Sequence, residues 1–187
     1  MEEAEVWALL EQQKAVVADH FEAGGLHRVR RFEGFDPLID PVATERLGTA
    51  LAARLAGSYD LVAVWDTLDA AVLGYVVGRA LERPVVRILD HEGLITASAP
   101  IAPGARAVFV APAISDPQEP RLTRALLEAR DATLATVAAL VDLATGTERP
   151  VALVRVETYP PETCPACRRG QPLSNARQPL APGGQHG

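Results

Sequence analysis

The sequence predicts an α/β fold, a mainly parallel sheet flanked by helices, and three observations support this prediction. Short, continuous apolar runs of the kind that is buried on both faces of a sheet recur through the middle of the chain. Segments of helical periodicity alternate with them, and this alternation favours parallel pairing through right-handed crossovers. The 187 residues are 48% hydrophobic and 22% charged, which suits one compact domain with a sizeable core.

Two helices are expected before the sheet. Apolar residues recur at helical spacing over 3–21, so we expect a first helix there, ended by Gly24-Gly25. A polar, arginine-rich connector follows over 26–40. A second helix is expected over 41–57, because its first residue is a proline, which suits a first helical turn, and its last is a glycine.

The sheet and its helices are expected between residues 59 and 160. Glycine, proline and small polar residues over 90–104 predict a long loop or a loose hairpin. Strands are predicted at 61–64, 84–89, 107–110, 133–141 and 151–156, and helices at 68–81 and 120–129. In an open sheet of this kind, ligands bind outside the carboxyl ends of the strands, so the loops after residues 64, 89 and 110 are the candidate site.

Composition excludes several classes of protein. A formal net charge of −6 argues against a nucleic-acid binder that depends on phosphate neutralisation. No apolar run approaches the roughly 18–20 residues that span a bilayer, so we expect no membrane partner. The N-terminus lacks the basic and apolar regions of a secretory signal, and two cysteines cannot form a disulfide framework, so a cytoplasmic protein is expected. Lys14 is the one lysine among 18 basic residues.

Three stretches resemble the orotate phosphoribosyltransferases, which are type I phosphoribosyltransferases. The run VALVRVETYPPETCPACRRGQPL, over 151–173, resembles the ending of a bacterial branch of that family in its Tyr-Pro-Pro, Cys-Pro-x-Cys and Gly-x-Pro-Leu elements. DHFEAGGLH, over 19–27, resembles the family's N-terminal His-Phe…Gly-x-His motif, one residue shorter. LGYVVGRAL, over 73–81, resembles the helix behind the diphosphate loop, and the order of elements matches from roughly residue 10 to 175.

The resemblance implies a Rossmann-like sheet with an N-terminal helical hood, usually assembled as a dimer. Its members join phosphoribosyl diphosphate and orotate with the help of magnesium. On this pattern one domain is expected over 1–170, with a disordered tail over 171–187 where glycine, proline, glutamine and asparagine dominate. The domain divides into helices and hood at 1–58, core at 59–160 and the Cys-Pro-Ala-Cys segment at 161–170.

The family's phosphate-binding segment is altered here. Members carry two acids that hold the ribose hydroxyls, then a Thr-Thr-Gly-Gly-Ser-like loop whose N–H groups and hydroxyls wrap the 5-phosphate. The acid positions are Ala111 and Pro112 in this chain. The loop positions are Ser115, Asp116, Pro117, Gln118 and Glu119. Proline donates no N–H, and two like charges about 4 Å apart repel by roughly 4 kcal/mol at an intermediate dielectric, so this loop is not expected to hold a phosphate.

The loop after the first predicted strand also departs from the pattern. Members use a small, glycine-rich turn there, whereas this chain has a tryptophan and two carboxylates, Asp66 and Asp69. These carboxylates could bind magnesium. The favoured interpretation is that Asp66 or Thr67 caps the helix that follows.

The third loop lacks the family's catalytic lysine. No lysine or arginine lies between Arg87 and Arg106. His91 is the one titratable group there that could become cationic, and an exposed loop histidine is the favoured interpretation.

Two further groups of residues stand out. His27, Arg28, Arg30 and Arg31 lie in the expected hood, where Arg30 and Arg31 could grip a small anionic or nucleotide-like ligand or form a solvated turn. Cys164 and Cys167 have the spacing of half a zinc site. With no second Cys-x-x-Cys or paired-histidine motif, zinc would need a second copy of the chain. A redox pair and a reduced structural turn are the alternatives, and the turn is favoured.

The leading hypothesis is a phosphoribosyltransferase-fold protein that has lost transfer activity. It would act as a binding or regulatory partner, in a dimer with itself or with an active relative, and no catalytic residue is assigned. The alternative is an active orotate phosphoribosyltransferase of pyrimidine synthesis with divergent loops, using magnesium and a lysine from a partner chain. A third possibility is another transferase or hydrolase with a magnesium cluster of Asp66, Asp69, Asp116 and Glu119.

Overall fold

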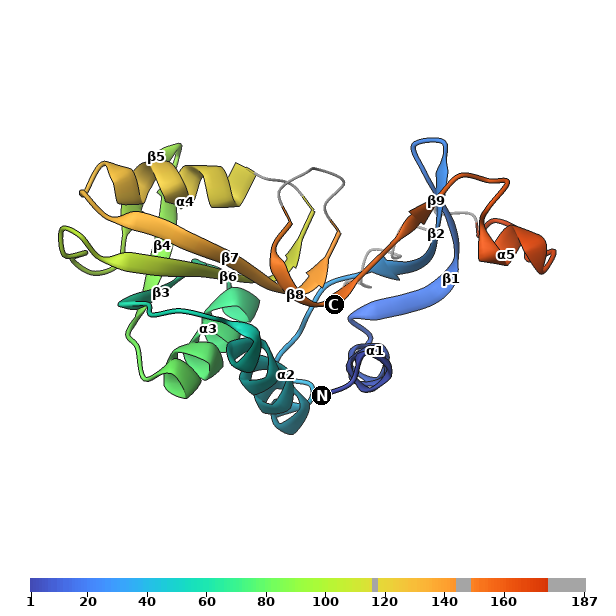
Figure 1. Cartoon of the computed structure of the whole chain (residues 1–187), viewed down its shortest axis with the longest axis horizontal. Helices are drawn as coiled ribbons and strands as arrows, with labels where there is room; N and C mark the ends of the chain where they lie inside the picture. The colour runs from blue at the N-terminus through green and yellow to red at the C-terminus, as the bar shows by residue number, and fades with distance from the viewer. Residues whose placement is uncertain (116–117, 144–148, 175–187) are drawn as a thin grey trace, which may run out of the picture. The chain divides into compact units, whose positions relative to one another are not determined.

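The computed structural model describes residues 1–115, 118–143 and 149–174 of the chain (Figure 1). They form two compact units. Of these residues, the sheet unit comprises those within 1–16 and 32–155, and the hairpin unit comprises 17–31 and 156–174.

A six-stranded sheet forms the centre of the sheet unit, in the order β5-β4-β3-β6-β7-β8. Five of its strands are parallel, and β5 pairs antiparallel with β4 at one edge. The strands are β3 (Leu61–Trp65), β4 (Val85–His91), β5 (Leu94–Ala97), β6 (Arg106–Ile114), β7 (Thr133–Asp142) and β8 (Val151–Arg155). The predicted parallel α/β fold is confirmed, and every predicted strand of the core is present.

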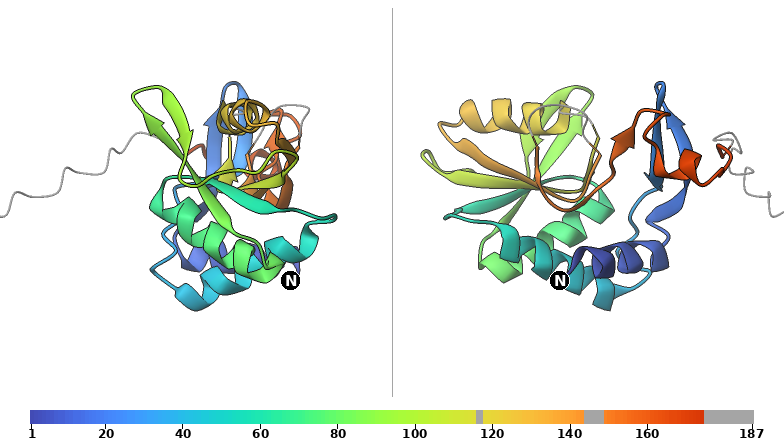
Figure 2. Two further views of the ribbon diagram at one scale, coloured as in Figure 1. Left: turned by 90° about the vertical axis from the view of Figure 1, so that its left-hand side faces the viewer. Right: turned by 45° about the vertical axis from the view of Figure 1, so that its right-hand side comes forward.

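Helices cover both faces of this sheet: α2 and α3 lie on one face and α4 on the other (Figures 1 and 2). The helices of the unit are α1 (Glu3–Gln12), α2 (Pro41–Arg54), α3 (Leu68–Leu81) and α4 (Gln118–Glu128). The Asp40 carboxylate caps α2 by accepting from the Ala43 N–H at 3.0 Å. Glycine lets α3 approach the sheet, because a Cβ at Gly74 would lie 2.5 Å from a methyl carbon of Val64. Central strands and helices bury Phe109, Leu73, Ile88, Leu127 and Leu140 completely.

The hairpin unit contains a three-stranded sheet in the order β1-β2-β9 and one short helix. Gly24 and Gly25 join β1 to β2 with φ of 59° and 79°, the two positive values that a type I′ hairpin turn needs. The elements are β1 (Val16–Ala23), β2 (Leu26–Phe32), β9 (Thr158–Tyr159) and α5 (Pro165–Arg168), and β1 and β2 each begin or end one residue inside the sheet unit.

The N-terminal expectations were wrong beyond residue 12. The first helix ends at Gln12, and Lys14 has a φ of 57°, which stops it. The segment expected to complete that helix is strand β1, and the expected connector contains strand β2. Gly24-Gly25 turns a hairpin rather than ending a helix.

Smaller differences concern boundaries. The second helix ends at Arg54 instead of Gly57, and the loose hairpin over 90–104 contains the defined strand β5. The expected tail begins too early, since residues 171–174 are described and hydrogen-bonded, while 175–187 lie outside the described residues.

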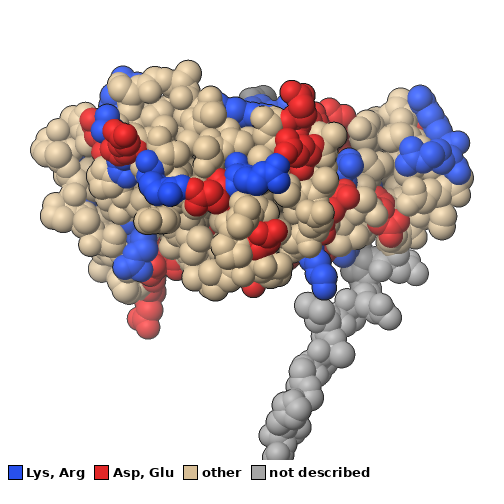
Figure 3. All heavy atoms as spheres, turned by 90° about the horizontal axis from the view of Figure 1, so that it is seen from below, with Lys and Arg blue, Asp and Glu red and all other residues tan. Residues whose placement is uncertain are grey.

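Charges of both signs are interspersed on the surface that Figure 3 shows. Two ion pairs of the sheet unit join neighbouring helices, Arg46 with Glu5 and Arg79 with Glu45. In the part of the chain that the structure describes, no helix has the length and apolar character needed to cross a membrane.

Candidate functional site

The carboxyl ends of β3, β4 and β6, with the loops that follow, form the carboxyl edge where the fold type binds ligands. Asp66 is the first residue after β3, and its carboxylate accepts from Nη1 of Arg87 on β4 at 2.5 Å. Both side chains are partly exposed. The ion pair therefore supplies Asp66 with a cation from the protein itself.

Neither candidate cap of α3 makes the expected bond. Thr67 occupies the N-cap position without a side-chain hydrogen bond, and the Asp66 carboxylate turns to Arg87. Asp69, in the first turn, accepts from the N–H of Ala70 at 2.9 Å. The favoured capping interpretation was wrong, because an ion pair with the neighbouring strand engages the carboxylate instead.

The loop after β6 occupies the position of the family's phosphate loop. Strand β6 continues through Ala111 and Pro112, both buried, to Ile114. Ser115 is exposed after the strand, and Gln118 and Glu119 are exposed in the first turn of α4. Asp116, the remaining candidate of this loop, lies outside the described residues, as does Pro117. Two buried apolar side chains thus stand where the resemblance places the ribose-binding acids.

The hairpin between β4 and β5 fills the place of the third loop. The Asp90 carboxylate accepts from the N–H of Gly93 at 2.7 Å and so closes the turn. His91 ends β4 and is exposed, as expected. Asp90 therefore has a local structural partner.

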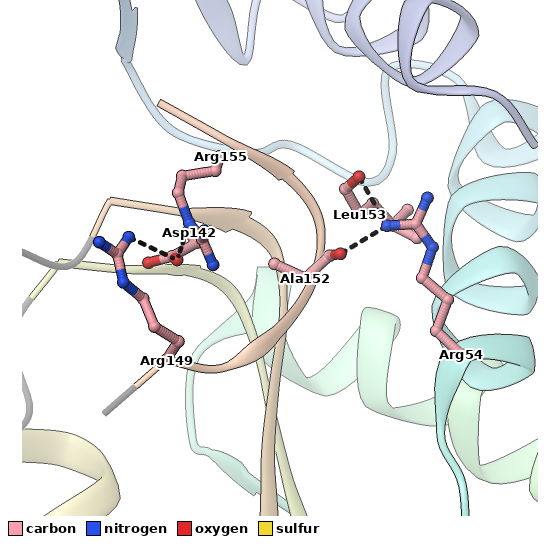
Figure 4. A network of polar contacts seen from close by, with 6 residues as sticks. All are labelled: Arg54, Asp142, Arg149, Ala152, Leu153 and Arg155. Atoms are coloured by element: carbon pink, nitrogen blue, oxygen red, sulfur yellow. Dashed lines mark hydrogen bonds and ion pairs between the residues drawn. The ribbon is translucent and has the colours of Figure 1, made fainter. Parts of the chain in front are cut away.

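A buried carboxylate that the sequence analysis missed lies at the end of β7 (Figure 4). Asp142 is completely buried and accepts from Nε of Arg155 at 2.6 Å, while Nη1 of Arg149 lies 3.5 Å away. Arg54 of α2 donates to two carbonyl oxygens of β8 at 2.6 and 2.7 Å. These contacts hold β7, β8 and α2 together, which is a structural role.

Four side chains of the hairpin unit converge on one point. This His–Cys cluster consists of His20, His27, Cys164 and Cys167, whose ligand atoms all lie within 4.8 Å of one another. Nε2 of His20 lies 3.0 Å from Nδ1 of His27, 3.5 Å from Sγ of Cys164 and 3.6 Å from Sγ of Cys167. Nδ1 of His27 lies 3.1 Å from Sγ of Cys167.

The backbone fixes the tautomer of His20. Its Nδ1 lies 2.8 Å from the carbonyl oxygen of Gln171, which can only accept, so Nδ1 carries the proton. In the neutral ring, Nε2 then presents its lone pair to the cluster. Asp19 holds Gln171 in place by accepting from its side-chain amide at 2.9 Å. The Ser174 hydroxyl also donates to Asp19 and lowers the pKa of that carboxyl.

The two thiols have different environments. Burial raises the pKa of Cys164, but hydrogen bonds from the backbone N–H groups of Cys167 and Ala166 outweigh this, and the pKa is lowered overall. Burial and the neighbouring Cys164 thiol raise the pKa of Cys167. One thiol thus ionises more readily than the other.

The expectation that a metal site would need a second chain missed two residues. His20 and His27 complete a set of four ligand groups within one chain. Both histidines stand in the DHFEAGGLH motif, on the two arms of the hairpin that Gly24-Gly25 closes. Reading that pair of glycines as a hairpin turn would have revealed them.

The remaining candidates do not join this cluster. Arg30 and Arg31 lie half-buried on β2, and the Arg31 guanidinium stacks over the Phe21 ring, 4.5 Å from its centroid. Among the residues that the structure describes, the His–Cys cluster is the one metal-ligating group of three or more side chains. Asp66, Asp69 and Glu119 form no such group, and the magnesium cluster has no support from the described geometry.

Comparisons with known proteins agree on the fold. No family model matches the sequence. The orotate phosphoribosyltransferase of Pelotomaculum thermopropionicum is 29% identical over 90% of this chain and 93% of its own length. Those of Heliobacterium modesticaldum and Thermus thermophilus are each 28% identical, over 92% and 90% of this chain and 96% and 98% of their own lengths.

Two solved structures are similar in fold. The orotate phosphoribosyltransferase from Aeropyrum pernix has a TM-score of 0.62 at 17% identity, over 79% of this chain and 92% of that one. A phosphoribosyltransferase from Corynebacterium diphtheriae has a TM-score of 0.62 at 21% identity, over 82% of this chain and 95% of that one. The resemblance stated from the motifs is confirmed: the chain is similar to orotate phosphoribosyltransferases and has the type I phosphoribosyltransferase fold.

Proposed function

We propose that this phosphoribosyltransferase-fold chain does not transfer phosphoribosyl groups and acts as a binding or regulatory partner, in a dimer with itself or with an active relative. The observation that carries the proposal is the chemistry of the carboxyl edge. Buried Ala111 and Pro112 replace the acids that would hold the ribose, and no lysine or arginine lies in the sequence between Arg87 and Arg106.

The phosphate loop itself supports the proposal on charge. Asp116 and Glu119 bring carboxylates to a loop that would have to surround a phosphate dianion, and Pro117 supplies no N–H donor. A single like-charge contact of roughly 4 kcal/mol would lower affinity by several hundredfold.

The ion pair at the carboxyl edge also supports the proposal. Arg87, the one arginine of β4, forms an ion pair with Asp66. A diphosphate would have to compete with that carboxylate for the guanidinium, so the ion pair opposes donor binding.

Calorimetry with phosphoribosyl diphosphate and magnesium tests the proposal. We expect no saturable heat, while the Thermus thermophilus relative, titrated in parallel as the positive control, should bind under the same conditions. The matched variant is Arg87→Ala, which should leave the null result unchanged. Saturable binding in the low micromolar range would contradict the proposal.

The alternative is an active orotate phosphoribosyltransferase, and the 26–29% identity to relatives of that name over about 90% of the chain favours it. Because the third loop has no lysine, this alternative requires a basic group from a partner chain. Orotate consumption should be followed for the chain alone and mixed with an active relative, each with donor and magnesium. Turnover by the chain alone supports the alternative, whereas altered turnover of the relative on mixing supports a regulatory partner.

A further inference from the structure

We propose that His20, His27, Cys164 and Cys167 of a single chain bind one zinc ion in a structural site that fastens the β1–β2 hairpin to the segment around α5. The proposal concerns a different part of the chain from the carboxyl edge. It stands whether or not the chain transfers phosphoribosyl groups.

The distances within the cluster are those of a tetrahedron around zinc. With Zn–N near 2.05 Å and Zn–S near 2.3 Å, tetrahedral ligands lie roughly 3.3 Å apart for two nitrogens and roughly 3.6 Å for nitrogen and sulfur. The observed nitrogen–nitrogen distance is 3.0 Å, three of the four nitrogen–sulfur distances are 3.1, 3.5 and 3.6 Å, and all the ligand atoms lie within 4.8 Å of one another. Small side-chain movements would therefore create the site.

The histidines are oriented for metal binding. The bond from His20 Nδ1–H to the Gln171 carbonyl leaves Nε2 as the ligand, an arrangement that positions the histidines of many metal sites. His27 presents its Nδ1 atom to the same point, and the two rings lie edge to face with centroids 4.7 Å apart.

Burial gives the second argument. Six of the side chains that the structure describes in the hairpin unit are buried: His20, Phe21, His27, Val156, Cys164 and Ala166. Half of this small core consists of the proposed ligands, where a unit of this size would otherwise need apolar side chains. Units too small for a hydrophobic core are commonly held by disulfides or a metal, and both cysteines here are free.

The ligand set selects the ion and its role. Two imidazoles and two thiolates in tetrahedral arrangement suit zinc, and four protein ligands leave no open position for water or substrate. Each thiol loses its proton as its sulfur binds the metal, and no electron is transferred. The site is thus structural rather than catalytic.

Metal content and cobalt substitution of the full chain test the proposal. Protein purified with a reductant should contain one zinc per chain. After zinc is removed and Co²⁺ is added, thiolate-to-cobalt charge-transfer absorption and the intense visible bands of a tetrahedral site should appear. Because this readout uses the unaltered chain, it does not depend on whether a variant folds.

Variants then assign the ligands. Cys167→Ser and His27→Gln should each lower the affinity for zinc by about tenfold or more, since changing even a residue that only hydrogen-bonds a ligand costs about tenfold to a hundredfold. His91→Gln is the matched control, an exposed histidine on the β4–β5 hairpin that should leave zinc content unchanged. Near-native circular dichroism of each variant should accompany the titration.

Three results would overturn the proposal. The first is a reduced, unaltered chain that takes up neither zinc nor cobalt. The second is octahedral cobalt spectra without sulfur charge transfer. The third is metal bound only by dimers, with half a zinc per chain, which would restore the shared site expected from the cysteines alone.

Discussion

The carboxyl edge and the His–Cys cluster differ in how their polar groups are satisfied. At the edge, three described carboxylates have partners within the protein: Asp66 pairs with Arg87, and Asp69 and Asp90 accept from backbone N–H groups. In the cluster, four ligand atoms face one another instead. These three carboxylates already have partners within the protein, whereas the cluster presents four atoms that can bind a metal ion.

This difference indicates that the hairpin unit, rather than the carboxyl edge, holds the group of side chains best suited to bind an ion. Buried polar groups need partners, and one metal ion would satisfy all four ligand atoms of the cluster together. The motifs that most clearly resemble the family, His-Phe…Gly-x-His and Cys-Pro-x-Cys, supply that cluster. The loops that carry the family's transfer chemistry are the ones that have changed. The proposed loss of transfer activity is therefore compatible with a resemblance over most of the chain.

Removal of the proposed metal should have the largest effect. A chelator stronger than the site should abolish amide protection in β1, β2 and β9, because structural zinc contributes roughly 10–16 kcal/mol in zinc-finger peptides. Strands β3, β6 and β7 should keep their protection, since their core is apolar. Hydrogen exchange followed by mass spectrometry distinguishes the two units.

The control for this prediction is zinc returned in slight excess, which should restore protection. Unchanged exchange in β1 and β2 after chelation would show that the hairpin is held by other contacts. Equal loss across all strands would show that the two units are one cooperative structure.

Asp142→Ala should have the next largest effect, because it removes a hydrogen-bonded, completely buried carboxylate. Hydrogen bonds to charged groups contribute about 1.5–3 kcal/mol, and Arg155, which is 43% exposed, can be hydrated after the change. We therefore expect the free energy of unfolding to fall by about 2 kcal/mol. Urea denaturation measures it, and a loss below about 0.5 kcal/mol would show that the network in Figure 4 is dispensable.

Gly74→Ala tests the packing of the scaffold behind the β3 loop. The new Cβ would lie 2.5 Å from a methyl carbon of Val64, whose side chain is completely buried. Overpacking costs about 1–3 kcal/mol, and the better helix propensity of alanine offsets about 1 kcal/mol, so a net loss near 1 kcal/mol is expected. In a double-mutant cycle with Val64→Ala, the two losses should sum to more than the loss in the double variant. Strict additivity would contradict the contact.

Sequence reasoning predicted the sheet well because the apolar runs and helical periodicity of the core are strong local signals. The helix over 68–81 was predicted to the residue. Sequence reasoning failed over 13–32, where the apolar residues fit both the helix and the strand period. The positive φ of Lys14 ends the helix there, and a strand follows. That failure concealed the cluster. On a helix, residues seven apart are separated by a rise of about 10.5 Å along the axis. The hairpin instead brings Nε2 of His20 to 3.0 Å from Nδ1 of His27.

The partners of the carboxyl-edge groups were equally invisible to local patterns. Asp66 and Arg87 are 21 positions apart, and their contact depends on parallel pairing in a particular register, with Val64 opposite Arg87. Helix capping was the natural local alternative. The ion pair with the adjacent strand engages the carboxylate instead, and a local pattern carries no signal for a contact at this separation.

The smallest expected effect concerns the ion pair of Asp66 and Arg87. It tests whether these side chains are as accessible to water as their exposed fractions indicate. The two side chains are 48% and 38% exposed, so a double-mutant cycle of Asp66→Ala and Arg87→Ala should give a coupling free energy below about 1 kcal/mol. The coupling should shrink further in 1 M salt, where charges are screened beyond about 3 Å. Salt-insensitive coupling of several kcal/mol would mean that the edge excludes water as a preorganised binding pocket does. The contrast drawn with the His–Cys cluster would then fail, because both regions would hold desolvated polar groups.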